Sequence, residues 1–242
     1  MQRLGIIGGS GLTRLQALQV ERHEVVSTPY GEPSAPLTFG RFDGLPVVFL
    51  PRHGSAHTIP PHRVNYRANI WALRHVGVDE VIGMAAVGGI TQPPGVICMP
   101  HQIIDYTWGR EHTFFEEDLT HVTHVDFTEP YCETLRHRLL HAAERLGVEV
   151  EWRGVYGAVQ GPRLESAAEI RRMERDGCDL VGMTGMPEAA LARELDLCYA
   201  CCAVVVNWAA GKTEGPITME EIEANLETGM AKARRLLEAL GQ

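Results

Sequence analysis

The 242-residue chain has no long apolar run, no cluster of basic residues and no tract of low complexity. Its longest apolar runs, such as AVVV at 203–206 and PVVFL at 46–50, are far too short to cross a bilayer. Lysine and arginine number 22 against 31 aspartates and glutamates, so the formal net charge is −9 and no basic face is available for a nucleic acid. We therefore expect a protein that neither spans a membrane nor binds nucleic acid.

The chain also lacks an internal repeat and a linker rich in proline, glycine or serine, which predicts a single domain over residues 1–242. Its first residues lead directly into LGIIGG without a basic and apolar leader pattern, so we expect a cytoplasmic location. Three of the six cysteines lie within 198–202, where reduced thiols would pack as small apolar side chains. Cys198 and Cys201 have CxxC spacing, but such positions point to opposite faces of a strand, and no metal site is predicted.

Apolar runs of strand length alternate with helical patterns along the chain. Strands are predicted over 4–9, 45–50, 80–89, 154–159, 179–184 and 198–206. Helices are predicted over 62–76, 129–146, 166–177 and 218–240, and a further helix starts at Pro187. Capping-box spacing marks two of the starts, at Ser166 with Glu169 and at Thr218 with Glu221. The alternation predicts an α/β fold in which helices flank a mixed, twisted β-sheet.

Ligands of such folds gather at the carboxyl ends of the strands, and polar residues follow several of the predicted strands. Ser10 lies in the glycine-rich turn GIIGGSGL, which lacks the third glycine of a dinucleotide site and the lysine of a Walker A loop. A backbone nest with a hydroxyl suits a small oxyanion, although a plain tight turn explains the glycines equally well. Arg52 and His53 end the second strand, and a guanidinium fork matches the oxygens of phosphate. Thr184 precedes a helix N-terminus, which also favours an anion.

Glu165 lies beside the start of a predicted helix. Its simplest interpretation is helix-dipole capping, which is worth up to about 1 kcal/mol. The apolar run 198–206 ends on Asn207, whose amide carries both a donor and an acceptor and so suits the edge of a heterocycle. From the residues alone, three oxyanion-type positions and one amide therefore lie at strand ends.

Several segments together resemble the trimeric purine nucleoside phosphorylases, a family that includes methylthioadenosine phosphorylase. The resemblance covers essentially the whole chain and rests on GIIGGSGL, RHG…HTIPPHRVNYRANIWAL, GPRLESAAE, MTGMPEAALARE and CYACCAVVVNWAAG. It implies phosphorolysis, in which the co-substrate phosphate attacks the anomeric carbon of a nucleoside and releases a purine and a sugar 1-phosphate. It implies no metal or organic cofactor, and a homotrimer in which His124 reaches the sugar pocket of a neighbouring subunit.

The resemblance also implies roles for individual positions. Asn207 and His53 are the candidate catalytic residues. The methylthioadenosine branch usually has a threonine where Ala85 stands, so one hydroxyl contact to phosphate is missing here. The candidate phosphate-binding residues are Ser10, Arg52, His53, Ala85, Ala86 and Thr184. The candidate nucleoside-binding residues are His124, Glu165, Met183, Asn207, Trp208, Ala209, Met219 and Ile222.

Asn207 and Glu165 carry the prediction of the base. The adenine-reading branch has aspartates at positions 207 and 209, whereas this chain has Asn207 and Ala209. An amide donates to O6 of a 6-oxopurine and accepts from a protonated N7, whereas an ionised aspartate can only accept. Glu165 stands where the 6-oxopurine phosphorylases have a glutamate, and its carboxylate accepts from N1–H, which adenine lacks. Both positions predict a 6-oxopurine.

Met219 carries the prediction of the sugar. It stands where ordinary inosine and guanosine phosphorylases have a histidine for the 5′-hydroxyl, and with Ile222 it would form an apolar pocket for a methylthio group. Core packing at a helix start is the other interpretation. The predicted reaction is phosphorolysis of 5′-methylthioinosine to hypoxanthine and 5-methylthioribose 1-phosphate. The alternatives are methylthioadenosine phosphorylase, a general inosine and guanosine phosphorylase, and a nucleotide-binding regulatory module without turnover.

Overall fold

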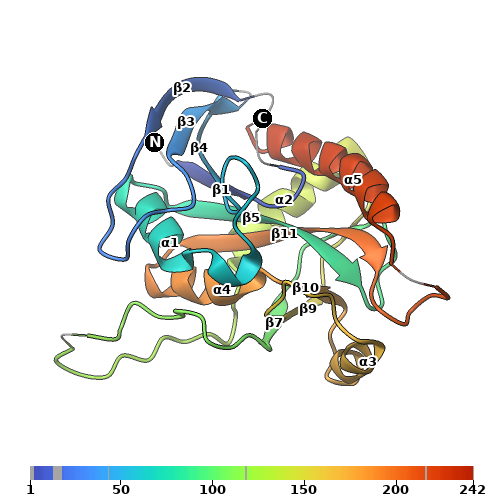
Figure 1. Cartoon of the computed structure of the whole chain (residues 1–242). Coiled ribbons are helices and arrows are strands. Elements are labelled where there is room, and N and C mark those ends of the chain that lie inside the picture. The colour runs from blue at the N-terminus through green and yellow to red at the C-terminus, as the bar shows by residue number, and fades with distance from the viewer. Residues whose placement is uncertain (1–2, 13–17, 43, 118, 216, 242) are drawn as a thin grey trace.

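The computed structural model describes residues 3–12, 18–42, 44–117, 119–215 and 217–241. Within these residues an 11-stranded sheet lies between helices (Figure 1). The strands are β1 (Leu4–Gly8), β2 (Gln19–Glu24), β3 (Leu37–Phe42), β4 (Leu45–Pro51), β5 (Glu80–Gly89), β6 (Ile97–Cys98), β7 (Gln102–Asp105), β8 (Val150–Glu151), β9 (Val155–Ala158), β10 (Leu180–Gly182) and β11 (Cys198–Trp208). The α-helices are α1 (Tyr66–His75), α2 (Glu133–Leu146), α3 (Ala167–Arg175), α4 (Gly185–Glu194) and α5 (Met219–Ala239), and a short 3-10 helix covers Pro61–Arg63.

The sheet mixes parallel and antiparallel pairs. At its centre β4, β1, β5 and β11 run parallel, so their carboxyl ends meet at one edge. The β2–β3–β4 meander is antiparallel, and β10 pairs antiparallel with the end of β5. The predicted α/β fold with a mixed sheet flanked by helices is confirmed.

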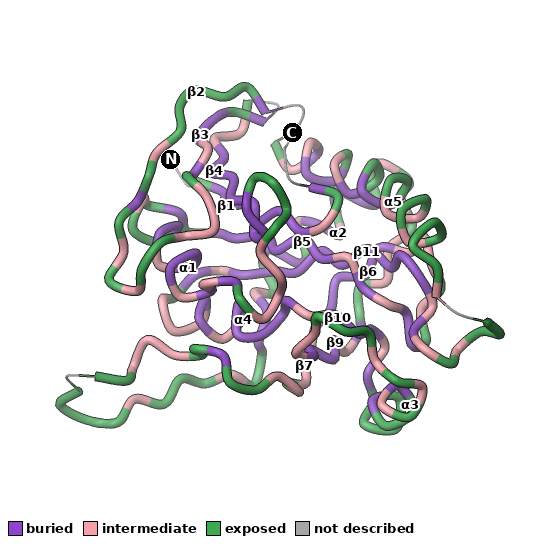
Figure 2. Tube along the Cα trace, viewed as in Figure 1, coloured by how far each residue is buried: buried purple, intermediate pink, exposed green. Residues whose placement is uncertain are grey.

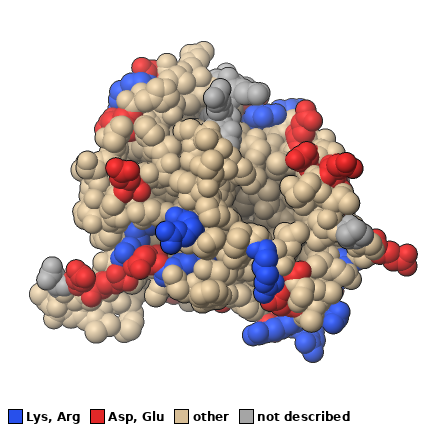
Figure 3. All heavy atoms as spheres, in the orientation of Figure 1, with Lys and Arg blue, Asp and Glu red and all other residues tan. Residues whose placement is uncertain are grey.

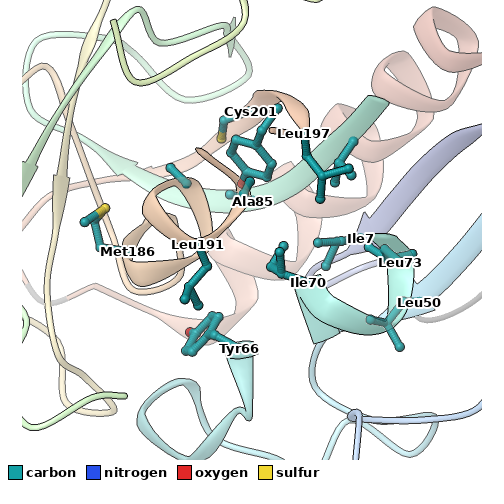
Figure 4. Close-up of a cluster of buried hydrophobic side chains, with 14 of the residues drawn as sticks. Ile7, Leu50, Tyr66, Ile70, Leu73, Ala85, Met186, Leu191, Leu197 and Cys201 are labelled. Carbon is teal, nitrogen blue, oxygen red and sulfur yellow. The ribbon is translucent and has the colours of Figure 1, made fainter. Parts of the chain in front are cut away.

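The unbroken apolar run of β11 follows from burial on both faces of the sheet. Tyr199 and Cys201 face the layer of α1 and α4, where Ile70 and Leu191 belong to the same buried cluster (Figure 4). Ala200 and Cys202 face the opposite layer, which α2 and α5 form with residues such as Leu139 and Met230. Because both faces are covered, a polar side chain at these positions needs a buried hydrogen-bond partner, as the hydroxyl of Tyr199 has in Glu188.

Several predicted boundaries differ from the observed ones. The helix predicted over 62–76 begins only at Tyr66, because the Asn65 side chain accepts from the Ala68 amide and caps it. The helix predicted from 129 begins at Glu133. Strands β2, β3, β6, β7 and β8 were not predicted: β6 and β8 have two residues each, and β2 is a polar, exposed strand without apolar alternation. The capping box of Ser166 and Glu169 is confirmed, and Thr218 caps α5 through the Glu221 amide.

The expectation that the three cysteines within 198–202 are reduced is wrong for Cys198. Cys132 and Cys198 form a disulfide across a sequence separation of 66 residues. The Cys132 amide donates to the Tyr199 carbonyl at 2.7 Å, which brings the start of α2 beside the start of β11. This proximity depends on tertiary structure and has no local sequence signal. Cys201 and Cys202 are free and buried as expected, and Cys98 and Cys178 are free and buried as well.

The connection between β7 and α2 is the most exposed long segment of the described chain, as the green stretch of Figure 2 shows. Its first part is fixed to the body: Arg67 of α1 pairs with Glu111 and Glu116, and Glu194 of α4 accepts from the Phe114 amide. No helix in the described ranges has the length and apolar character needed to cross a bilayer.

Candidate active site

A cavity of about 380 Å³ opens where the central strands end. Figure 3 shows a hollow near the centre of this face, bordered mainly by uncharged residues. The cavity draws residues from the turn after β1, the end of β4 and the following loop, the second half of β5, the segment before α3, the β10–α4 junction, the end of β11 and the start of α5. Its volume lies within the range of small-molecule sites.

Most of the predicted site residues line this one cavity, although they are spread over more than two hundred positions of the sequence. The residues brought together are Ser10, Arg52, His53, Ala85, Ala86, Glu165, Met183, Thr184, Asn207, Ala209 and Ile222. Three predicted residues, His124, Trp208 and Met219, do not line it.

Arg52 is the most buried charged group of the cavity wall, with 1 % of its surface exposed. Its Nε and Nη2 donate to the two carboxylate oxygens of Glu188, each at 2.7 Å, and Nη1 donates to the Met84 carbonyl at 2.7 Å. Burial alone would lower the pKa of Arg52, but the Glu188 carboxylate outweighs it and raises that pKa, so the guanidinium stays charged. Arginine has five N–H donors, so two remain for a ligand.

His53 presents a neutral imidazole to the cavity. Its Nδ1 lies 2.8 Å from the Ile59 carbonyl, which only accepts, so Nδ1 carries the proton and Nε2 holds the lone pair. Burial, followed by the neighbouring Arg52 charge, lowers the pKa of His53 to about 4. At neutral pH the ring therefore offers an acceptor to whatever occupies the cavity.

Ser10 and Thr184 are two hydroxyl-bearing residues of the cavity lining. The Ser10 Oγ lies 3.2 Å from Nε2 of His57, a residue with φ of 53° in the left-handed region. Thr184 precedes the first turn of α4 and is buried, and its side chain makes no capping bond in the described structure. The backbone of α4 is not helical at Met186, so Thr184 does not lie at a regular helix N-terminus. The two hydroxyls beside the guanidinium of Arg52 still form a suitable site for a tetrahedral oxyanion.

Asn207 lies directly after an irregularity in β11. The register of β11 against β5 shifts between Val205 and Asn207, and Asn225 of α5 donates to the Val206 carbonyl at 2.9 Å. The Asn207 Nδ2 donates to the Trp208 carbonyl at 2.7 Å, which fixes the plane of the amide. Its Oδ1 and its second N–H remain available to a ligand.

Glu165 does not cap α3, because Ser166 and Glu169 form the capping box themselves. Glu165, the residue before the N-cap of α3, therefore makes no capping hydrogen bond, and it lines the cavity. Burial, with a further contribution from the charge of Glu169, raises the pKa of Glu165.

Met219 lies away from the cavity wall. As the first residue of α5 it is 64 % exposed, whereas Ile222 and Leu226 on the next turns line the cavity with Ile217. Within this chain Ile222 lines the cavity and Met219 does not, so the structure does not bring the two predicted pocket residues together. The apolar wall is Ile217, Ile222 and Leu226.

His124 and Trp208 also lie elsewhere. His124 is exposed on the β7–α2 connection, and Trp208 alternates with Asn207 and Ala209 at the end of β11, so its side chain leaves the cavity. No group of three His, Cys, Asp or Glu side chains among the described residues is placed to hold a metal.

Sequence reasoning missed residues that hold the site together. Glu188 fixes Arg52, and His57 contacts Ser10. Arg110 is buried and donates to the backbone carbonyls of Met183 and Gln160, which joins the β10–α4 junction to the segment before α3. The stiff PRHGSAHTIPP segment was a signal for His57, whereas neither Glu188 nor Arg110 stands out in the sequence.

Comparison with known proteins identifies the family. The model of the phosphorylase superfamily matches residues 3–241. A protein of Pseudomonas syringae pv. tomato named "Probable S-methyl-5'-thioinosine phosphorylase" is 56 % identical over 96 % of this chain and 95 % of its own. The 6-oxopurine nucleoside phosphorylase of Pyrococcus furiosus is 48 % identical over 92 % of this chain and 85 % of its own.

A solved structure shows that the similarity extends to the backbone. Methylthioadenosine phosphorylase from Schistosoma mansoni in complex with adenine superimposes with a TM-score of 0.95 at 32 % identity, over 100 % of this chain and 91 % of that one. The extent of the family match and the identity to these relatives agree with the observed sheet and cavity. The chain belongs to the phosphorylase superfamily.

Proposed function

We propose that this protein catalyses the phosphorolysis of S-methyl-5′-thioinosine to hypoxanthine and 5-methylthioribose 1-phosphate. The observation that carries the proposal is the presence of Asn207 and Glu165 in the same cavity as Arg52. An amide and a carboxylate that face one ligand suit O6, N7 and N1–H of a 6-oxopurine. The charged end of the cavity suits the phosphate, which attacks the anomeric carbon of the sugar.

At the phosphate end, Arg52, Ser10, Thr184 and the Ala86 backbone N–H hold the anion under the sugar. Cleavage of the glycosidic bond passes through an oxocarbenium-like state, which a phosphate anion beneath the ring stabilises. His53 accepts a hydrogen bond from a protonated phosphate oxygen through its Nε2. No cofactor is required for these steps.

At the base end, the leaving purine gains negative charge as the bond breaks. A proton from water is taken up at N7 and neutralises that charge, while Asn207 accepts from the resulting N7–H through Oδ1 and donates to O6. Glu165 accepts from N1–H, a contact that adenine does not offer. An adenine nucleoside would leave the carboxylate unpaired, and such mismatches discriminate strongly between substrates.

The 5′ end of the sugar lies against Ile217, Ile222 and Leu226. Burial of a methylthio group on this wall gains about 1–2 kcal/mol, whereas a 5′-hydroxyl loses a hydrogen bond to water. The printed names of relatives that are 52–56 % identical support the same substrate.

The assembly is a homotrimer with shared sites. The β7–α2 connection carries His124 together with exposed apolar residues, of which Trp108 is 72 % exposed and Val122 is 73 % exposed. Apolar exposure of this kind supports a protein interface at this connection, where we infer that His124 reaches the sugar pocket of a neighbouring subunit. We expect the enzyme to work in the cytoplasm.

The test is a phosphate-dependent assay of methylthioinosine, methylthioadenosine, inosine and guanosine side by side. We expect hypoxanthine release that requires phosphate, with methylthioinosine the best substrate. Equal use of inosine and methylthioinosine would favour the second candidate, a general 6-oxopurine nucleoside phosphorylase like the Pyrococcus furiosus relative. Preference for methylthioadenosine would contradict the base assignment, and no turnover of any nucleoside would favour a regulatory module.

A further inference from the structure

Behind the cavity wall, Arg52 belongs to a buried hydrogen-bonded chain that includes groups out of reach of a ligand. Glu188 of α4 has no exposed surface, and its Oε1 accepts both from Nη2 of Arg52 and from the hydroxyl of Tyr199, each at 2.7 Å. Tyr199 lies near the start of β11 and is 2 % exposed. The chain therefore joins the end of β4, helix α4 and strand β11.

The contacts of Arg52 leave its guanidinium one orientation. The fork to Glu188 uses Nε and Nη2, and the bond to the Met84 carbonyl uses Nη1. A bidentate pair fixes the plane of the guanidinium as well as its position. The two remaining N–H groups, one on Nη1 and one on Nη2, point away from these partners, and Arg52 lines the cavity.

Gly83 of β5 leaves the space in which this chain sits. A Cβ at position 83 would lie 2.2 Å from the Tyr199 hydroxyl oxygen and 2.7 Å from Glu188 Oε1. Both distances are far below van der Waals contact. A residue without a side chain on the central strand is therefore required for the Tyr199–Glu188 hydrogen bond.

We propose that Glu188, held by Tyr199 in the space that Gly83 leaves, is the positioning residue that aims Arg52 at phosphate. The inference rests on the proposed function, because it takes the anion at Arg52 to be the attacking phosphate. Neither Glu188 nor Tyr199 touches the substrate. They act through the orientation of one guanidinium.

A role in charge alone makes the opposite prediction. If Glu188 only reduced the positive charge at the anion site, then Glu188→Gln would strengthen phosphate binding, because an uncompensated arginine attracts phosphate more strongly. If Glu188 positions Arg52, the same change weakens binding, because the glutamine NH₂ faces an N–H of the guanidinium and breaks the fork. The sign of the change in phosphate KM separates the two.

The experiment measures kcat and the separate KM values for phosphate and methylthioinosine in wild type, Glu188→Gln and Tyr199→Phe. We expect Glu188→Gln to raise the phosphate KM about tenfold or more, and Tyr199→Phe to raise it about threefold, because each loses a hydrogen bond to a charged group. The nucleoside KM should stay within about twofold in both, since the base contacts are intact.

The matched control is Tyr131→Phe. Tyr131 is a buried tyrosine stacked on Tyr199, with 6.1 Å between the ring centroids, and its hydroxyl has no hydrogen-bond partner among the described residues. Loss of that hydroxyl should leave the phosphate KM unchanged. Equal effects of Tyr131→Phe and Tyr199→Phe would overturn the proposal, because a general packing defect would then explain both.

Folding and function are kept apart by further measurements. Should Glu188→Gln not fold, Tyr199→Phe still decides the question, since it keeps the size of the side chain and the buried ion pair. An unchanged or lowered phosphate KM in Tyr199→Phe, or a lowered one in Glu188→Gln, refutes the positioning role. Failure of wild type to release hypoxanthine with phosphate refutes the proposed function instead, so the two failures are distinguishable.

Discussion

At the phosphate end of the cavity Arg52 is 1 % exposed and donates to two partners, the Glu188 carboxylate and the Met84 carbonyl, whereas at the start of α5 Met219 is 64 % exposed and lies outside the cavity. The resemblance assigned both residues to the site, and for Arg52 the chemistry of the residue supported the same assignment. Arg52 follows a central parallel strand, so the sheet itself determines its place. Met219 begins a helix at the edge of the site, where few neighbours of the same chain fix its direction. Position within the sheet therefore predicts a site residue more reliably than position at a helix end.

Arg52→Ala gives the largest expected effect and tests the buried end. It removes the donors to phosphate and leaves Glu188 buried without its partner, so kcat/KM for phosphate should fall about 10²- to 10³-fold. Steady-state kinetics with varied phosphate measure this, with circular dichroism as the check of folding. Arg22→Ala, which removes an exposed ion pair on β2, is the control and should change nothing. A changed preference between hypoxanthine and adenine nucleosides in Arg52→Ala would contradict its assignment to phosphate.

Asn207→Asp tests the base end of the cavity and should have the next largest effect. An ionised aspartate cannot donate to O6, so methylthioinosine turnover should fall about 10- to 100-fold while some methylthioadenosine is accepted. Full adenine activity should also require Ala209→Asp and a change at Glu165, since both line the same cavity. The measurement is kcat/KM for both nucleosides at saturating phosphate. An unchanged order of substrates would refute the role given to the amide.

His53 extends the comparison to the pH dependence of stability. Burial and Arg52 lower the pKa of His53 to about 4, so between pH 6.5 and 4 the unfolded chain binds a proton that the folded chain does not. Stability should therefore fall as pH falls through this window, by up to about 3 kcal/mol from this residue. Urea unfolding at pH 7 and pH 4.5 measures the loss. His53→Gln should reduce this loss of stability, because it removes the buried ring. An equal loss in His53→Gln and wild type would contradict the burial argument.

The smallest expected effect compares two residues on the first turns of α5. Ile222→Ser places a hydroxyl on the apolar wall, so the preference for methylthioinosine over inosine should narrow about fivefold. Met219→Ser, one turn away and exposed, should change the preference less than about twofold, as surface substitutions do. The measurement is the ratio of kcat/KM for methylthioinosine to kcat/KM for inosine in each variant. A larger effect at Met219 would return that residue to the site, through a neighbouring subunit.

Local chemistry made part of this protein predictable from its sequence. The spacing of Ser166 and Glu169 predicts a capping box from neighbouring residues alone, and the apolar run of β11 predicts a strand buried on both faces. Asn207 was found for the same reason, since it ends that run. The disulfide of Cys132 with Cys198 and the hold of Glu188 on Arg52 join residues far apart in the sequence. No local pattern carries such contacts, because the fold creates them.

The shift in β11 between Val205 and Asn207 separates two kinds of selective pressure. Up to Val205, every side chain packs against a helical layer, so a substitution must suit the core before it can suit a ligand. Beyond the shift, positions 207 and 209 line the cavity, and Ala209 also packs in a buried cluster. Under the proposed function, we expect changes of purine specificity at these two positions, while the strand before them stays as it is. This backbone matches that of an adenine complex closely at 32 % identity, as expected if a few positions set the substrate while the fold is kept.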